Sequence, residues 1–150
     1  MKPITARSSI AVHAPAAFVW DFLRVYDNDP LWRSGLERMA QDPPGPVRDG
    51  ARVEETLRVL GRTVESLVEV SDVRDGGFTW RVTRGAIAEG SRSVTTTGAD
   101  SCRVDVVKRV TLTGSDRLLT PLLTIVIRRT ELGDLQRAKH LLEQSWKDRP

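Results

Sequence analysis

The sequence contains a single cysteine, Cys102, and only two histidines, His13 and His140. One cysteine excludes an intrachain disulfide and a thiolate-rich metal site, and it fits a reducing compartment. A zinc site needs about three or four protein ligands, and neither histidine stands at a recognisable ligand spacing from other candidates. We therefore expect no metal site and no cofactor in this protein.

Long hydrophobic runs and blocks of one charge are also missing. Lys2, Pro3 and Arg7 interrupt the first ten residues, so no signal peptide is expected, and the most apolar stretch, 118–127, is too short to cross a bilayer. The net charge is only +3. Acidic and basic residues are mixed along the chain, whereas nucleic-acid binding favours a basic stripe with interleaved aromatics. We expect a cytoplasmic protein without an integral membrane segment and without a nucleic-acid partner.

The remaining composition is that of an ordinary globular protein. The chain has 150 residues, of which 39% are hydrophobic and 29% charged. This length suffices for one compact core, and no repeat, low-complexity tract or linker divides it. The sequence predicts a single domain over residues 1–150.

The first third of the chain predicts one strand and two short helices. Residues 4–12 alternate between two faces, which is typical of a half-buried strand. Pro15 then precedes apolar residues at helical spacing, which predicts a helix to about Val25. Asp29 stands where it can cap a second short helix that carries Leu31 and Trp32.

Turn residues divide the middle of the chain into runs rich in valine and threonine. These runs predict antiparallel strands at 52–60, 63–73, 78–83, 86–97 and 102–113. From Ser115 or Asp116 to about Ser145 the pattern predicts one long helix, with Pro121 near its start. The second half of this helix has an apolar stripe on one side. The first half is apolar nearly all round, which indicates that most of the circumference of that half is buried inside a cupped sheet. This order of elements predicts an α+β fold with one curved antiparallel sheet of about six to seven strands.

Several strings in this order resemble the SRPBCC superfamily, the START-like proteins that include polyketide cyclase/dehydrase and lipid-transport members. The strings are Ser9–Pro15 leading into Val19–Leu23, then Trp32, and finally Gly133–Glu143. The resemblance covers nearly the whole chain and implies a helix-grip fold, in which the curved sheet surrounds the C-terminal helix. It also implies an apolar cavity between the two, entered past the short helices. It implies no reaction, because many members only bind lipids, quinones, hormones or polyketides.

Two charged residues are candidates for the cavity. Lys108 alternates with Val106 and Val110 in the last strand, and Glu55 alternates with apolar residues in its own strand. An unpaired buried charge is costly, so Glu55 is a candidate partner for Lys108. Two interpretations stay open, since strand ends or a bulge would turn both side chains to solvent. If both point inward, they can take part in acid/base chemistry, together with Arg84 or Tyr26.

Other residues are candidates for the cavity wall. Trp80 is expected in the core or the wall, and Trp32, which follows a polar turn, is expected at the cavity mouth, either as a gate or as packing. The predicted ligand-binding set is Trp32, Trp80, Val82, Val110, Leu119, Leu122 and Val126.

The leading hypothesis is a protein that binds a small hydrophobic molecule, such as a lipid, quinone or polyketide-like compound. The alternative is a polyketide cyclase or dehydrase that uses the polar residues named above. A third hypothesis is a module that presents its cavity mouth to another protein, and the sequence leaves a homodimer open. The apolar run 118–127 with Arg128 and Arg129 also fits docking onto a membrane surface or a partner chain.

Overall fold

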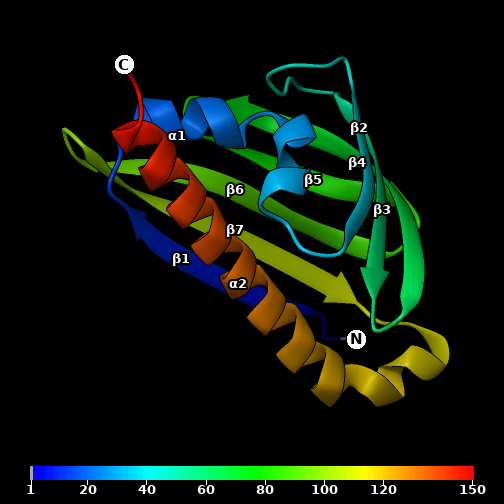
Figure 1. Cartoon of the computed structure of the whole chain (residues 1–150). Coiled ribbons are helices and arrows are strands. Elements are labelled where there is room, and N and C mark those ends of the chain that lie inside the picture. Colours follow the sequence, from blue (N-terminus) through cyan, green and yellow to red (C-terminus); the bar gives the residue numbers. More distant parts are fainter. Residues whose placement is uncertain (1) are drawn as a thin grey trace.

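The computed structural model describes residues 2–150. They form one antiparallel sheet with two short helical segments after the first strand and a long helix at the end (Figure 1). The elements are β1 (Ile4–Val12), α1 (Ala16–Leu23), the 3₁₀ helix η1 (Tyr26–Leu31), β2 (Leu36–Asp42), β3 (Arg52–Val59), β4 (Arg62–Arg74), β5 (Gly77–Arg84), β6 (Ile87–Gly98), β7 (Ser101–Thr111), the 3₁₀ helix η2 (Gly114–Leu119) and α2 (Thr120–Lys147).

The sheet has seven strands within residues 2–150, in the order β1-β7-β6-β5-β4-β3-β2. Every neighbouring pair is antiparallel, and β1 pairs with β7, so the first strand joins the last. The sheet curves, and α2 crosses its concave side next to β1 (Figure 1). Helix α1 lies near the C-terminal end of α2, and η1 packs beside β2. The predicted α+β helix-grip fold is confirmed.

The six predicted strands are present, and their ends differ from the prediction by two residues or fewer. A seventh strand, β2, was not expected between Leu36 and Asp42. This edge strand contains no β-branched or aromatic residue, and Gln41 is its one buried position. Its strand conformation depends on pairing with β3, the next strand in the chain, so its own residue pattern gives little indication of it.

The second short helix differs from its prediction. It is a 3₁₀ helix over Tyr26–Leu31, and Trp32 follows it. Asp29 lies inside this helix and caps nothing, because its carboxylate binds Arg92 and Arg33. The predicted capping role of Asp29 is therefore wrong.

The long C-terminal helix is divided near its start. η2 covers Gly114–Leu119 and α2 begins at Thr120. Pro121 has no backbone N–H, so it cannot continue an α-helix backward to the Arg117 carbonyl. The Thr120 hydroxyl donates to that carbonyl at 2.7 Å instead.

The first part of α2 is buried on one side only. Leu118 is 84% exposed, and Leu122 and Ile125 are about half exposed at 49% and 53%. The expectation of burial around most of the circumference is therefore wrong, because the sheet curves past the inner side of the helix and leaves the outer side open (Figure 1). The second half follows the prediction, with Leu135, Ala138 and Leu142 buried. Within residues 2–150, no helix has the length and apolarity that crossing a bilayer requires.

The core lies at the end of the sheet that α1 and the second half of α2 cover. It contains Val19 and Leu23 from α1, Leu135 from α2, and Phe78 from β5, each at most 1% exposed. At the other end of the sheet no helix fills the concave side to the same degree, which leaves room for the cavity described below.

Gly90 lets the Trp80 indole lie against the concave side of β6. The two residues face each other across the β5–β6 pair. A Cβ at residue 90 would meet the Val107 carbonyl oxygen and would lie 2.6 Å from Cζ2 of Trp80. Glycine in a strand interior marks such close approach.

We expect Gly90→Ala to lower the free energy of unfolding by about 1–3 kcal/mol, because the added methyl group forces Trp80 or β7 to move. Gly133→Ala is the matched control, since a Cβ there meets nothing within 4 Å outside its own helix. This control should raise stability by about 0.5–1 kcal/mol through its helix propensity. Urea unfolding followed by tryptophan fluorescence measures both, and equal effects of the two substitutions would contradict the close packing at Gly90.

Candidate functional site

A cavity of about 410 Å³ lies between the concave side of the sheet and the inner side of α2. Its walls are mainly apolar and come from strands on both sides of the cup and from the start of α2. The wall residues include Val64, Val82, Val106, Val110, Leu119 and Leu123. Such a volume lies within the range of small-molecule sites, roughly 300–1,000 Å³.

Strand alternation explains which side chains reach this cavity. In β7, Val106, Lys108 and Val110 line it at every second position, Val107 between them also borders it, and Leu112 continues the series just after the strand. In β3, Glu55, Leu57 and Val59 do the same. Successive side chains of a strand point to opposite faces of the sheet, so every second side chain of β7 and of β3 faces the cavity.

Most residues of the predicted ligand-binding set lie along the cavity. Trp32, Trp80, Val82, Val110, Leu119 and Leu122 line it. Val126 lines a neighbouring hollow of about 280 Å³ between α2 and the end of β3. Of the predicted acid/base candidates, Tyr26, Glu55 and Lys108 face the cavity, whereas Arg84 is an exposed residue at the end of β5.

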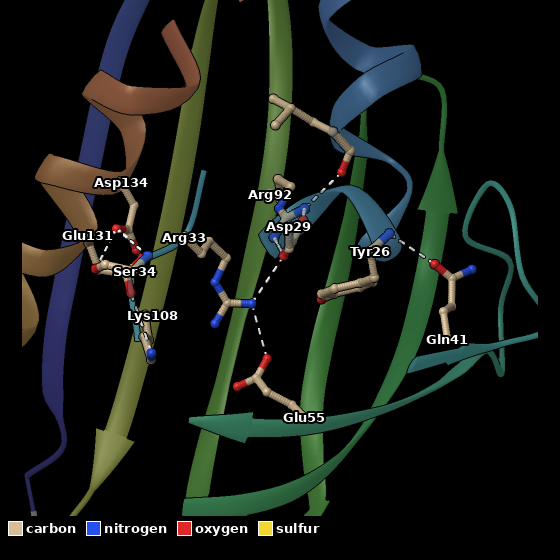
Figure 2. Close-up of polar contacts among 11 residues, drawn as sticks. Tyr26, Asp29, Arg33, Ser34, Gln41, Glu55, Arg92, Lys108, Glu131 and Asp134 are labelled. Atoms are coloured by element: carbon tan, nitrogen blue, oxygen red, sulfur yellow. Dashed lines mark hydrogen bonds and ion pairs between the residues drawn. The ribbon is translucent and has the colours of Figure 1, made fainter. Parts of the chain in front are cut away.

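A buried ion pair forms the inner end of the cavity. Arg92 in β6 donates to both carboxylate oxygens of Asp29 in η1, at 3.0 and 2.8 Å, and to the Leu23 carbonyl at 2.8 Å (Figure 2). Asp29 is 0% and Arg92 5% exposed. Burial acts to lower the pKa of Arg92, but Asp29 outweighs it and raises that pKa, so the guanidinium stays charged. The Arg92 guanidinium also lies 5.0 Å from the ring centres of Tyr26 and Trp32.

Arg33 extends this ion pair toward the open part of the cavity. Its guanidinium bonds Asp29 at 3.1 Å and Glu55 of β3 at 3.0 Å (Figure 2). Burial acts to lower the pKa of Arg33, and the carboxylates of Glu55 and Asp29 together raise it above its ordinary value. The result is a row of alternating charges, Arg92, Asp29, Arg33 and Glu55, which ties β6 and η1 to β3.

The Tyr26 hydroxyl belongs to the same inner end. Tyr26 is 3% exposed and lines the cavity. In Figure 2 its hydroxyl points to the side of the Arg33–Glu55 pair. Burial, the largest influence, raises the pKa of Tyr26 well above its ordinary value, against the effect of the nearby Arg92. The hydroxyl is therefore protonated at neutral pH and can donate a hydrogen bond.

Lys108 and Glu55 do not pair with each other. The Lys108 ammonium lies 3.4 Å from Glu131 of α2, and Glu55 bonds Arg33. The proposed partnership of the two residues is wrong, because α2 and the segment after η1 bring nearer partners that strand parity alone does not reveal. Both side chains nonetheless line the cavity.

A second polar contact fastens α2 to the segment after η1. The backbone N–H and the hydroxyl of Ser34 both donate to Asp134, at 3.0 and 2.9 Å (Figure 2). Burial raises the pKa of Asp134 above its ordinary value, although the bonds from Ser34 act to lower it. The sequence gives no local sign of this contact, since the residues are 100 positions apart.

Trp32 lies at the inner end and not at the mouth. It is 4% exposed and stacks near Arg92, so its predicted place at an exposed mouth is wrong. The exposed wall residues include Leu60 at 52% and Leu122 at 49%, together with Arg62 at the start of β4 and Ala86 after β5. The cavity therefore opens where the β3–β4 turn approaches η2 and α2, and not past the two short helices.

No group of three or more His, Cys, Asp or Glu side chains within residues 2–150 is arranged to hold a metal ion. Cys102 is buried in the core, and burial raises the pKa of its thiol. The polar side chains that line the cavity include Tyr26, Arg33, Glu55, Lys108 and Glu131.

Comparison with known proteins gives a family match over most of the chain. Residues 3–138 match the family model described as polyketide cyclase / dehydrase and lipid transport. No curated protein sequence matches significantly.

Solved structures share the fold at low sequence identity. TTHA0849 from Thermus thermophilus superposes with a TM-score of 0.81 at 15% identity, over 94% of this chain and 98% of that chain. The Zhui aromatase/cyclase from Streptomyces sp. R1128 gives 0.76 at 15% identity, over 93% of each chain. A START superfamily protein from Mycobacterium smegmatis gives 0.67 at 15% identity, over 95% of this chain and 97% of that chain.

We expect Asp29→Ala to lower the free energy of unfolding by about 3–5 kcal/mol, because it leaves Arg92 charged and buried without its carboxylate. Asp29→Ala/Arg92→Met should recover more than half of this loss, since it removes both charges. Asp105→Ala is the matched control, because its pair with Arg103 is exposed, and it should cost about 1 kcal/mol or less. Urea unfolding measures all three, and an Asp29→Ala effect no larger than that of Asp105→Ala would contradict the structural role of the pair.

Proposed function

Because the chain belongs to the polyketide cyclase/dehydrase and lipid transport family, we propose that it binds a small, largely apolar and uncharged molecule in the cavity. An oxygen atom of this ligand faces Tyr26 and Arg33 at the inner end. The observation that supports this proposal is a 410 Å³ space with apolar walls that ends in a charge-balanced polar cluster.

The apolar walls supply the affinity under this proposal. Burying apolar surface contributes roughly 25 cal/mol per Å², so a ligand that covers a few hundred Å² of wall gains several kcal/mol before binding entropy opposes it. The cavity is large enough for a drug-sized molecule, which argues against the hypothesis of a module that uses its mouth only to hold a partner protein.

The charge balance of the inner end argues for an uncharged ligand. Arg92 and Arg33 are neutralised by Asp29 and Glu55, and Lys108 is neutralised by Glu131. A ligand carboxylate or ammonium would enter without a counter-ion, and burial of an unpaired charge is costly. A carbonyl, hydroxyl or phenol oxygen has no such cost if it receives a hydrogen bond.

Tyr26 is the donor that can meet this oxygen. Its hydroxyl is protonated, lines the cavity and forms no hydrogen bond to any other side chain or backbone group among residues 2–150 that the structure records. Arg33 lies beside it and uses one nitrogen, Nη1, for both of its carboxylate contacts. The remaining guanidinium N–H groups of Arg33 are the second set of donors.

A cyclase is the second candidate, and the same cluster favours it. A protonated phenol next to a buried guanidinium can stabilise charge that develops on a carbonyl oxygen during enol formation. Lys108 and Glu131 line the same cavity and could carry protons. Under this alternative the ligand is a poly-β-ketone and Tyr26 donates to the reacting carbonyl.

We expect Ala88→Trp to weaken ligand binding about tenfold or more, because Ala88 lines the cavity and the indole would occupy its space. The probe is prodan, an uncharged naphthyl ketone whose emission shifts when it leaves water. Ile87→Trp is the matched control, since Ile87 precedes Ala88 in β6 and is 56% exposed. Fluorescence titration gives the two affinities. Equal prodan binding by both variants would place the ligand outside the cavity.

We expect Tyr26→Phe to weaken prodan binding by about fivefold, which corresponds to one lost neutral hydrogen bond of about 1 kcal/mol. The expected effect on turnover of a poly-β-ketone, if the cyclase alternative holds, is a fall of about 100-fold or more. Native mass spectrometry of the protein from its producing cell would identify a bound molecule directly. Prodan binding unchanged in Tyr26→Phe would contradict the role of Tyr26 as the donor.

A further inference from the structure

The open end of the cavity carries large apolar side chains on the outside of the molecule. Leu118, Leu122 and Ile125 are 84%, 49% and 53% exposed, and Leu60 at the β3–β4 turn is 52% exposed. We call these four residues the mouth surface. The Arg62–Asp116 ion pair at 2.9 Å fastens the β3–β4 turn to η2 and so holds the two parts of the mouth surface together.

Lining the cavity does not explain why the outer, exposed side of α2 is apolar. Leu119, Leu123 and Ile127 face inward and line the cavity. Ile125 and Leu132 lie on the exposed side of α2 with Arg129 between them, and Leu118 precedes them in η2. Leu122 stands at the edge between the two sides, because it is half exposed and also lines the cavity. The helix is therefore apolar on two sides, and only the inner side has a partner among residues 2–150.

The charges beside the mouth surface are mainly positive. Arg62, Arg128 and Arg129 are exposed. Arg62 pairs with Asp116, and Glu131, the nearest acidic residue to Arg128 and Arg129 in the sequence of α2, pairs with Lys108. Arg128 lies 3.4 Å from the Thr5 backbone carbonyl, a neutral acceptor. Large apolar side chains flanked by arginines on one helix side are typical of a helix that lies in the interface of an anionic membrane.

We propose that the mouth surface docks onto an anionic phospholipid bilayer, with α2 lying along the headgroup region. Leu118 and Ile125 enter the acyl boundary and the arginines contact lipid phosphates. A second copy of this chain fits less well, because a two-fold pairing through this surface would place the exposed arginines of both copies in one interface, where they repel one another. The docked orientation turns the open end of the cavity toward the lipid. This proposal goes beyond ligand binding and does not require it.

The test is co-sedimentation of the full chain with vesicles. We expect binding to phosphatidylcholine vesicles that contain about 30 mol% phosphatidylserine, and much weaker binding to phosphatidylcholine alone or at high salt. Leu118→Ser/Ile125→Ser should weaken binding about tenfold or more, because it removes two apolar anchors. Arg128→Gln/Arg129→Gln should weaken it to a similar degree and reduce the dependence on phosphatidylserine.

Two matched variants control for non-specific effects. Leu31→Ser removes a leucine that is 61% exposed in η1, away from the mouth surface. Arg48→Gln/Arg52→Gln removes two exposed arginines at the opposite end of the sheet. Both should bind vesicles as the unchanged protein does. Circular dichroism reports that each variant is folded, so this control does not depend on ligand binding.

Three results would overturn the proposal. The first is no sedimentation with phosphatidylserine vesicles, and the second is equal binding by the Leu118→Ser/Ile125→Ser variant and the Leu31→Ser control. The third is a dimer in sedimentation velocity that Leu118→Ser/Ile125→Ser converts to a monomer, which would assign the surface to a second copy. Because prodan binding is measured separately, failure of membrane docking leaves the proposed cavity function intact.

Discussion

The buried pair of Arg92 and Asp29 is the contact on which the inner end of the cavity depends. It joins the middle of β6 to η1 with two hydrogen bonds, and neither residue has appreciable contact with solvent. Charges without a partner are not tolerated at such a depth, so each residue fixes the other. Once η1 is held against β6, Tyr26 and Arg33 take their places, and Ser34 reaches Asp134 on α2. The polar inner end is thus a consequence of one long-range ion pair.

The open end of the cavity is organised by different means. There the β3–β4 turn, η2 and the start of α2 meet through the exposed Arg62–Asp116 pair, with apolar side chains around it. An exposed ion pair contributes little to stability, about 1 kcal/mol or less. The two ends of the cavity therefore differ in polarity and also in how strongly their ion pairs stabilise them. Under the proposed function, the rigid end orients the ligand and the weakly held end is where it enters.

The fold could be predicted largely from the sequence, because its signals are local. Alternation in residues 4–12 and 102–113 and the apolar stripe of the last helix depend on neighbouring residues only. The same alternation placed Val110 and Lys108 on one face of β7, and both line the cavity. The edge strand β2 was missed because Leu36–Asp42 has a weak pattern and gains its conformation from β3.

The partners of the charged residues could not be predicted in the same way. Arg92 stands in a strand of serine, valine and threonine and gives no sign of being buried, and its partner Asp29 lies 63 residues earlier. Glu55 was assigned to Lys108 because both alternate with apolar residues, but alternation determines a face and not a neighbour. Which charges meet depends on how η1 and α2 cross the sheet, and that geometry arises only when distant segments assemble.

The distribution of apolar residues in the last helix connects the cavity with the outside of the protein. A helix that only closed a cavity would need one apolar side, and residues facing water on its other side would be polar. Leu122 and Ile125 break this rule at the position where the cavity opens, and the second half of α2, which covers the core, obeys it with Arg137 and Gln144 exposed. Exposed leucines lower the solubility of a free protein, so the grouping of Leu60, Leu118 and Leu122 at the mouth is explained if that surface is covered during function. A bilayer that covers it would also supply an apolar phase next to the apolar walls, so that a hydrophobic ligand could pass between them without crossing water.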